Sequence, residues 1–300
     1  MVKIRVPAST ANLGPGFDTL GMALSLYNYV EAELEEEGLT IQVIGEGTDT
    51  IPTDQSNIVY KVMKAVFTRA GFQPKGLKIK LTNNIPVARG LGSSAAAIVG
   101  GALAANSLIS NPFSYDDLLF IVTQVEGHPD NVAPALLGGL VTSIYTAEKV
   151  ICKKINLPDD LNLVVAIPDF ALSTKIARNA LPKNIPLKDA VFNIGNCSLL
   201  ILAFLEGDYA LLRQVMKDKI HQPYRLPLVP GMNKVFEAAL AAGAISVALS
   251  GAGPTLIAFT KDNTEKIGKA MQDAFMEYDI KSQYKILTPD LAGAKVIDVE

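Results

Sequence analysis

A long run of residues without a charged side chain, from Gly90 to Tyr115, limits the folds that this chain can adopt. Its length would suit a membrane span, but its glycines, serines, asparagines and Pro112 make it too polar for the core of a bilayer. We therefore expect a helix from Ser93 to about Ser107 that is buried inside the protein. A helix without a polar face needs neighbouring elements on all sides.

The chain is long enough to supply those neighbours. With 300 residues it exceeds the size at which one hydrophobic core keeps growing, so we predict two packed subdomains. Hydrophobic residues make up 49% and charged residues 19%, which is ordinary for a globular enzyme. The net charge is -3, and Lys and Arg are scattered. Such a surface offers no footprint for nucleic acid or for an anionic membrane, and we expect neither as a partner.

The cysteines and the N-terminus favour a cytoplasmic location. Cys152 and Cys197 are far apart in the sequence and lack metal-ligand spacing, which argues against a zinc cluster or a disulfide framework. Pro7, Asn12 and Gly14 interrupt the region where a signal peptide would need an unbroken apolar core.

Hydrophobic periodicity predicts an α+β fold. In the first half we expect a glycine-rich loop between the first two strands, strands at residues 2–6, 24–34, 40–45, 77–83 and 140–146, and helices at 57–70, 93–107 and 114–124. In the second half we expect strands at 162–168, 245–249, 255–259, 283–288 and 294–298, and helices at 188–206, 208–217, 231–242 and 263–277. A polar stretch around residues 148–160 separates the halves, so we place the subdomains at residues 1–157 and 158–300.

The segment PVARGLGSSAAA, residues 86–97, predicts an anion-binding site at the start of the buried helix. Gly90 and Gly92 allow positive φ and close approach of the backbone, and Ser93 and Ser94 add hydroxyl groups beside the unpaired amides of the first turn. The simpler interpretation is a pair of loop glycines followed by a serine helix cap. Because the helix is expected to be buried, its N-terminus should point at something specific.

Gly90, Gly92 and Ala95 also match the dinucleotide-binding pattern G-x-G-x-x-A. A Rossmann unit needs a second parallel strand that ends in an acidic residue about twenty residues later. Here Asp116 and Asp117 open another helix instead, which argues against that unit. The P-loop pattern G-x-x-x-x-G-K-[ST] occurs nowhere in the sequence.

Two further glycine-rich segments make the pattern specific: PASTANLGPGFD at residues 7–18 and LSGAGPT at 249–255. Each alone indicates only a turn or loop. Together, in this order and at these distances, the three segments resemble the motifs of the GHMP kinases, the superfamily of galactokinase, homoserine kinase, mevalonate kinase and phosphomevalonate kinase. The resemblance covers essentially the whole chain.

Within this superfamily the first motif resembles that of the homoserine kinases, because sugar and mevalonate kinases typically carry a Lys and a Gly-Glu-His run there. The strings EGHPDNVAPALLGG at 126–139 and STKIARNALPK at 173–183 agree with the same branch. The resemblance implies a two-subdomain fold, with an N-terminal half like domain 2 of ribosomal protein S5 and a ferredoxin-like C-terminal half. It also implies phosphorylation of L-homoserine by ATP with Mg²⁺, on the route to threonine, by a homodimer.

The resemblance further implies which residues bind the nucleotide and the metal. Ser94 and Glu126 would reach Mg²⁺, which prefers a few hard oxygen ligands. Asn57 matches the position that contacts adenine, although an isolated Asn is more often a helix cap. The full set expected around ATP is Asn57, Pro86, Arg89, Gly90, Leu91, Gly92, Ser93, Ser94 and Ala95.

For the amino-acid substrate, the resemblance assigns Asp18 to the ammonium and Arg178 and Arg225 to the carboxylate, a task that suits the guanidinium fork. Asp130 and Asn131 would orient the acceptor hydroxyl, and the phosphate itself could take its proton, since phosphoryl transfer asks little of a base. The expected substrate contacts are Asn12, Asp18, Asp130, Asn131, Thr174, Arg178, Arg225 and Gly251. We assign no catalytic role to His128 or His221, the two histidines.

Three other functions fit parts of the pattern. The same fold could phosphorylate a sugar, mevalonate or shikimate, but an ammonium-binding Asp18 is needed only for an amino acid. A ligand sensor that had kept the phosphate loop should show a damaged motif, and none is seen. A dinucleotide-dependent oxidoreductase would need the Rossmann context that is missing here.

Overall fold

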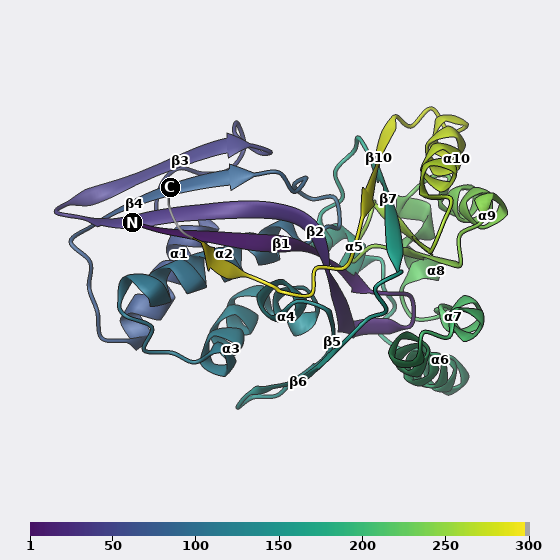
Figure 1. Cartoon of the computed structure of the whole chain (residues 1–300), viewed down its shortest axis with the longest axis horizontal. Coiled ribbons are helices and arrows are strands. Elements are labelled where there is room, and N and C mark those ends of the chain that lie inside the picture. Colours follow the sequence, from purple (N-terminus) through teal and green to yellow (C-terminus); the bar gives the residue numbers. More distant parts are fainter. Residues whose placement is uncertain (298–300) are drawn as a thin grey trace.

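The computed structural model describes residues 1–297, which form two sheets that lie side by side (Figure 1). The larger sheet has the strand order β11-β1-β2-β4-β3. In addition, β5 pairs with residues 20–22 near the start of β2 and with β6. Its strands are β1 (Val2–Asn12), β2 (Gly16–Glu35), β3 (Gly38–Gly45), β4 (Gly76–Asn83), β5 (Leu140–Tyr145), β6 (Val150–Ile155) and β11 (Lys295–Ile297). All pairs are antiparallel except β3 and β4, which are parallel and are joined through helix α1 (Ile58–Arg69).

The second sheet is antiparallel, with the order β10-β7-β9-β8. Its strands are β7 (Asn162–Pro168), β8 (Ser246–Leu249), β9 (Leu256–Thr260) and β10 (Ser282–Leu287). Helices lie between β7 and β8, and α10 (Thr264–Met276) lies between β9 and β10. This βαββαβ arrangement is ferredoxin-like, as predicted.

Helix α2 (Ser93–Leu108) is the buried, uncharged helix that the sequence predicted. It lies against the large sheet together with α1, α3 (Tyr115–Glu126) and α4 (Pro129–Leu137) (Figure 1). Two glycines explain how closely it packs. A Cβ atom on Gly100 would come 2.6 Å from Val30 of β2, and one on Gly101 would come 2.6 Å from Val62 of α1. Neither position could carry a larger side chain without moving its neighbour.

The second sheet is buried on both faces. Alternate residues of β7 point to opposite cores: Leu163 and Val165 face the core that continues from the first sheet, and Val164 and Ala166 face a separate core under α9 and α10. The helices of this half are α5 (Thr174–Asn179), α6 (Leu187–Glu206), α7 (Tyr209–Val215), α8 (Gln222–Arg225), the 3₁₀ turn η1 (Leu226–Leu228), α9 (Met232–Ala242) and α10.

The predicted glycine-rich loop between the first two strands was too long. β1 continues to Asn12 and β2 begins at Gly16, so the two form one long hairpin whose pairing shifts register at Pro7/Ala8 and Ala11/Asn12. The hydrophobic pattern failed here because Ser9 and Thr10 are polar, yet both are fully buried. Their hydroxyl groups are hydrogen-bonded inside the protein, as described below.

The sequence also missed several short elements. β6 lies in the polar stretch that we took for a connector, and α4, α5 and α8 were not predicted. The strand predicted at 294–298 is observed as β11 at Lys295–Ile297, and residue 298 lies outside the described residues. Because β11 pairs with β1, the end of the chain returns to the first sheet. The division at residue 157 stays a prediction.

Candidate active site

Three segments that are far apart in the sequence meet at one cavity between the two sheets. They are the end of β1, the loop before α2 and the loop between β8 and β9, which correspond to the three glycine-rich motifs. Ser9 donates its backbone N–H to the carbonyl of Leu91 (3.1 Å), and Gly251 donates to the carbonyl of Ala11 (3.1 Å). Thr255 donates its N–H to the carbonyl of Arg89 (3.2 Å), which joins the loop between β8 and β9 to the loop before α2. The three segments therefore hold one another in place.

The start of α2 is built for an anion. Its N-cap is Gly92, in the left-handed region with φ 69°, and no side chain caps the first turn. A Cβ atom there would lie 2.0 Å from Ser9 Oγ, and one on Gly90 would lie 2.3 Å from the carbonyl oxygen of Ser250. Only glycine fits at both positions. The free amides at the positive end of a helix of 16 residues bind negatively charged groups.

The simpler interpretation, a serine that caps the helix, is wrong. Ser93 is the first helical residue, and its hydroxyl donates to the carbonyl of Ile85 (3.3 Å) rather than capping the amides. The Ser250 hydroxyl instead supports the loop from outside, because it donates to the carbonyl of Gly90 (2.6 Å) and lies 2.9 Å from Thr10 Oγ1.

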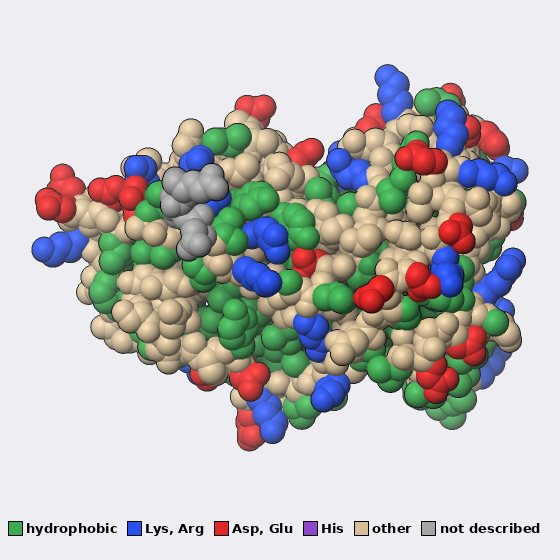
Figure 2. Space-filling view, viewed as in Figure 1, with side chains coloured by type: hydrophobic (Ala, Val, Ile, Leu, Met, Phe, Trp, Pro, Cys, Tyr) green, Lys and Arg blue, Asp and Glu red, His purple; other side chains and the backbone are tan. Residues whose placement is uncertain are grey.

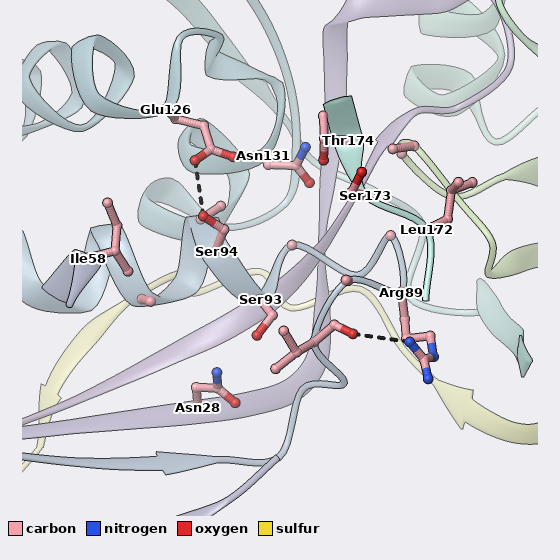
Figure 3. Close-up of a pocket in the computed structure, with 18 of the residues that line it drawn as sticks. Asn28, Ile58, Arg89, Ser93, Ser94, Glu126, Asn131, Leu172, Ser173 and Thr174 are labelled. Carbon is pink, nitrogen blue, oxygen red and sulfur yellow. Dashed lines mark hydrogen bonds between the residues drawn. The ribbon is translucent and has the colours of Figure 1, made fainter. Parts of the chain in front are cut away.

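Ser94 and Glu126 face each other across the cavity from α2 and α3 (Figure 3), with 3.3 Å between Ser94 Oγ and Glu126 Oε2. Burial raises the pKa of the Glu126 carboxyl above its ordinary value, although the charge of His128 works in the opposite direction. One hydroxyl and one carboxylate beside the uncapped start of α2 match the hard oxygen ligands of Mg²⁺. The residues present therefore fit this metal.

Part of the cavity wall is apolar, and we call it the apolar slot. The cavity has a volume of about 470 Å³, and this part of its wall is formed by Val30, Ile51, Pro52, Leu81 and Val87. The sequence did not identify these residues, because they come from β2, β4 and two loops.

Asn57 lines the same end and is fully buried. Its Oδ1 accepts from Val59 N–H at the start of α1 (2.8 Å), and its Nδ2 donates to the carbonyl of Pro52 (2.6 Å). The side chain is thus a helix cap that fixes the wall of the slot.

At the other end, α4 brings His128, Asp130 and Asn131 together. His128 Nδ1 makes a short contact with Asp130 Oδ1, and Asn131 Nδ2 donates to the same oxygen (3.3 Å). Burial lowers the pKa of His128, but the hydrogen bond and charge of Asp130 outweigh it, so the pKa is raised. Asp130 is already engaged by these donors. Asn131 is fixed in turn by Ser9 Oγ, which donates to its Oδ1 (2.9 Å).

Asp18 and Arg178, which we expected to bind opposite ends of the substrate, bind each other. The two guanidinium nitrogens lie 2.8 and 3.0 Å from the two carboxylate oxygens, a bidentate pair. The pair is about one-third exposed on the wall of the cavity. Asp18 also lies near Asp130 and His128, because one ligand atom of each lies within 4.8 Å of the others.

Arg225, which lies between Pro223 and Pro227 in the sequence, is 2% exposed on the short helix α8. It donates to the carbonyls of Ala177 (3.3 Å) and Gly251 (3.0 Å). Burial and the nearby charge of Arg178 lower its pKa to about 10. Asn12 reaches the same carbonyl of Gly251 with its Nδ2 (2.9 Å) and accepts the Asp18 backbone N–H on its Oδ1 (3.0 Å).

His221, which the sequence left without a role, is fully buried beneath this pocket. Its Nε2 lies 2.8 Å from the carbonyl of Gly14, its Nδ1 lies 3.2 Å from Arg225, and its ring stacks on Phe17 at 5.3 Å. Burial lowers the pKa of His221. A neutral ring that donates from Nε2 and accepts from Arg225 at Nδ1 satisfies both contacts. His221 therefore ties the turn around Gly14 to Arg225.

The remaining expected residues divide into three groups. Thr174, Ala95 and Gly251 line the cavity. Pro86 and Leu91 are buried and are not among its lining residues. Arg89 borders the cavity (Figure 3). Its guanidinium donates to the carbonyls of Val87, Pro168 and Asp169, so it ties the loop to the end of β7. Among residues that sequence reasoning missed, Ser9 and Ser250 lie inside the recognised motifs.

Comparisons with known proteins agree with this geometry. Residues 57–139 match the N-terminal domain of the GHMP kinases, and residues 200–277 match their C-terminal domain. The chain is 52% identical to the homoserine kinase of Moorella thermoacetica, over 99% of this chain and 100% of that protein. It is 47% identical to the homoserine kinase of Carboxydothermus hydrogenoformans, over 98% and 96%.

Solved structures are similar as well. A crystal structure of homoserine kinase from Cytophaga hutchinsonii superposes with a TM-score of 0.91 at 35% identity and covers 99% of this chain and 97% of its own. A mevalonate kinase from L. major, in complex with R-mevalonate, has a TM-score of 0.71 at 17% identity and covers 96% of each chain. At that identity the second likeness shows the fold alone.

Proposed function

The chain belongs to the homoserine kinases, a family of the GHMP kinases, and we propose that it transfers the γ-phosphoryl group of ATP to the side-chain hydroxyl of L-homoserine. The predicted family resemblance is thereby confirmed. The observation that carries the function is the identity of 52% to a homoserine kinase over the whole chain. The product, O-phospho-L-homoserine, would enter the route to threonine.

We propose that ATP binds with its base in the apolar slot beside Asn57 and its phosphates at the start of α2. The uncapped amides of the first turn of α2 support this proposal, because they would donate hydrogen bonds to the phosphate oxygens. Ser94 and Glu126 would hold Mg²⁺, which would neutralise part of the phosphate charge when bound. Because Glu126 is buried and its pKa is raised, a bound cation would favour its ionised form.

For homoserine, we propose that Arg178 and Arg225 bind the carboxylate and that Asp18 binds the ammonium. The substrate carries one charge of each sign. Its ammonium can pair with Asp18 and its carboxylate with Arg178, so neither side chain loses its ionic partner when the Asp18–Arg178 pair opens. Asn12 and Thr174 complete the pocket wall.

Asp130 and Asn131 would then orient the acceptor hydroxyl toward the γ-phosphate. Asp130 shares its Oδ1 with His128 and Asn131, which favours a role in positioning over removal of a proton. Phosphoryl transfer permits this, because its loose transition state depends chiefly on alignment and charge.

The test is Mg²⁺-dependent ADP release with L-homoserine, compared with L-serine, L-threonine, mevalonate and galactose. We expect the highest kcat/KM for homoserine and no turnover after removal of divalent ions with EDTA. Turnover of mevalonate or galactose in place of homoserine would assign the fold to another acceptor. The free state of Cys152 and Cys197 supports the proposed cytoplasmic location.

A further inference from the structure

Arg225 is a buried cation without an acidic partner. Figure 2 shows Lys and Arg side chains that extend from one face of the molecule into solvent, where such cations usually lie. Arg225 instead is 2% exposed and lines the cavity, and within residues 1–297 it takes part in no ion pair. A buried charge without a counter-charge is costly, so the binding of an anion beside Arg225 is favoured.

We propose that His221 is the positioning residue that directs Arg225 toward the carboxylate of the substrate, an inference that rests on the proposed function. The guanidinium carries its donors in one rigid plane. Its Nε donates to the carbonyl of Ala177 (3.3 Å), and its Nη1 donates to the carbonyl of Gly251 (3.0 Å) and to His221 Nδ1 (3.2 Å). Nη2 makes no hydrogen bond within residues 1–297 and is not enclosed, so it is the edge left for an anion.

His221 acts through Arg225 and not on the substrate. It is fully buried and is not among the residues that line the cavity. Its Nε2 lies 2.8 Å from the carbonyl oxygen of Gly14 and 3.6 Å from Asp218 Oδ2. Two acceptors beside Nε2 keep the ring proton on that nitrogen, so the lone pair of Nδ1 faces Arg225.

The neutral state of His221 matters for this role. Burial lowers its pKa, and the charge of Arg225 lowers it further, although the charges of Asp218 and Asp18 work in the opposite direction. A neutral acceptor fixes the direction of the guanidinium and leaves its charge uncancelled. A carboxylate at the same place would pair with Arg225 and weaken its attraction for the substrate.

The backbone on either side of His221 is held firmly, so the imidazole cannot follow a shift of Arg225. Asp218 accepts the backbone N–H groups of Ile220 (2.9 Å), His221 (2.9 Å) and Gln222 (2.6 Å). The Gln222 side chain in turn accepts the N–H of Leu249 (2.7 Å), which joins α8 to the end of β8. Arg225 therefore takes its direction from a fixed point.

Phe17 supports the same arrangement from the other strand. Its ring stacks on the His221 ring at 5.3 Å, and the Cζ atoms of Arg225 and Arg178 lie 5.4 and 5.7 Å from its centroid. Guanidinium groups at these distances are attracted to an aromatic face. One ring thus brings together the two cations that we assign to the carboxylate.

The competing role for His221 is structural only, as a tether for the turn at Gly14. Two substitutions separate the two ring nitrogens. Asn can place its oxygen near the position of Nδ1, so His221→Asn keeps an acceptor for Arg225 and loses the donor to Gly14. Gln reaches the position of Nε2, so His221→Gln keeps the donor to Gly14 and loses the acceptor for Arg225.

Steady-state kinetics of the purified full chain provide the test. His221→Gln should raise KM for homoserine by about 10–100-fold, because Arg225 loses a hydrogen bond that fixes its direction. His221→Asn should stay within about threefold of the wild type. In both variants kcat and KM for ATP should change little, since the carboxylate does not react. Equal effects of the two variants, or a larger effect of His221→Asn, would overturn the proposal in favour of the structural tether.

Two substrate analogues show which group of homoserine is affected. The compound 3-aminopropan-1-ol lacks the carboxylate, and 4-hydroxybutyrate lacks the ammonium. His221→Gln should lose preference for homoserine over 3-aminopropan-1-ol by the same factor of about 10–100. Its preference over 4-hydroxybutyrate should be kept, because Asp18 is untouched. Loss of both preferences to the same extent would refute a specific role in carboxylate recognition.

A measurement on the wild type needs no substitution. Long-range ¹H–¹⁵N spectra of the imidazole groups should show that the proton of His221 is on Nε2, with and without homoserine. A proton on Nδ1 would leave no acceptor for Arg225 and would rule the proposal out, even where a variant fails to fold by circular dichroism. Turnover of homoserine by the wild type tests the proposed function separately, since the tautomer can be read without activity.

Discussion

Replacement of Asp18 by Asn tests how the protein recognises the ammonium group of its substrate. The variant keeps the size and most of the hydrogen-bonding capacity of the side chain and removes its charge. A hydrogen bond to a charged group contributes about 1.5–3 kcal/mol, and Asp18 is one-third exposed, so the lower part of this range applies. A loss of about 1.5–2 kcal/mol corresponds to a 10–30-fold fall in kcat/KM for homoserine.

The loss should appear in KM rather than in kcat. The ammonium does not react, so its contact with Asp18 is made equally in the ground state and in the transition state. KM for ATP should stay unchanged. The free energy of unfolding should fall by no more than about 1 kcal/mol, because the Asp18–Arg178 pair is partly exposed.

Steady-state kinetics with homoserine and with 4-hydroxybutyrate, which lacks the ammonium, provide the assay. The wild type should prefer homoserine, and Asp18→Asn should lose most of that preference. Asp160→Asn is the control, since it removes a carboxylate from another exposed pair, with Lys261, whose atoms are 2.6 Å apart. A variant at position 18 that still distinguished the two substrates fully would refute the assignment of Asp18 to the ammonium.

Three other predictions concern the phosphate end of the site. Ser94→Ala and Glu126→Gln should each lower kcat by about 100-fold or more, as expected when groups that stabilise transition-state charge are removed. An unaltered rate of phosphoryl transfer in single-turnover kinetics would contradict the metal assignment. Without Mg²⁺, the raised pKa of Glu126 means that its contribution to stability is present at low pH and is lost as pH rises through that pKa. At a pH above that pKa, Glu126→Gln should therefore unfold at a higher temperature than the wild type. Equal melting temperatures of the two proteins across the pH range would show that burial does not destabilise the ionised carboxyl. Gly92→Ala should destabilise the protein by about 1–3 kcal/mol and abolish nucleotide binding in calorimetry, because its Cβ would overlap Ser9 Oγ and its φ is left-handed. Normal ATP affinity would contradict the proposed phosphate-binding site at the start of α2.

Much of the fold could be predicted from local sequence. The charge-free helix, the helices that flank it and most strands follow from hydrophobic periodicity, which reports burial on one or more faces. The long β1–β2 hairpin could not be predicted in this way. Ser9, Thr10 and Asn12 are polar but buried, and only their hydrogen bonds to distant segments make that possible.

The candidate site divides in the same way. The proposed phosphate-binding turn is local, so its glycines and serines could be recognised in one short segment of the sequence. The apolar slot is not local, since Val30, Leu81 and Val87 look like any other strand or loop residues. The pairing of Asp18 with Arg178 joins residues 160 positions apart, and neither carries a sequence signal for the other.

The pattern at Gly90, Gly92 and Ala95 shows why a motif alone does not specify a site. The same spacing fits a dinucleotide-binding turn as well as the turn of a GHMP kinase. The contacts of each glycine decide between these two interpretations. Here Gly92 lies against Ser9 of β1, and Gly90 lies against the carbonyl of Ser250 in the loop between β8 and β9. The first contact requires β1 and α2 to pack together, and the second requires the two sheets to meet. The geometry of the phosphate cradle therefore belongs to the assembled fold, and substitutions at Ser9 or Ser250 should disturb nucleotide binding although neither is among the residues that line the cavity.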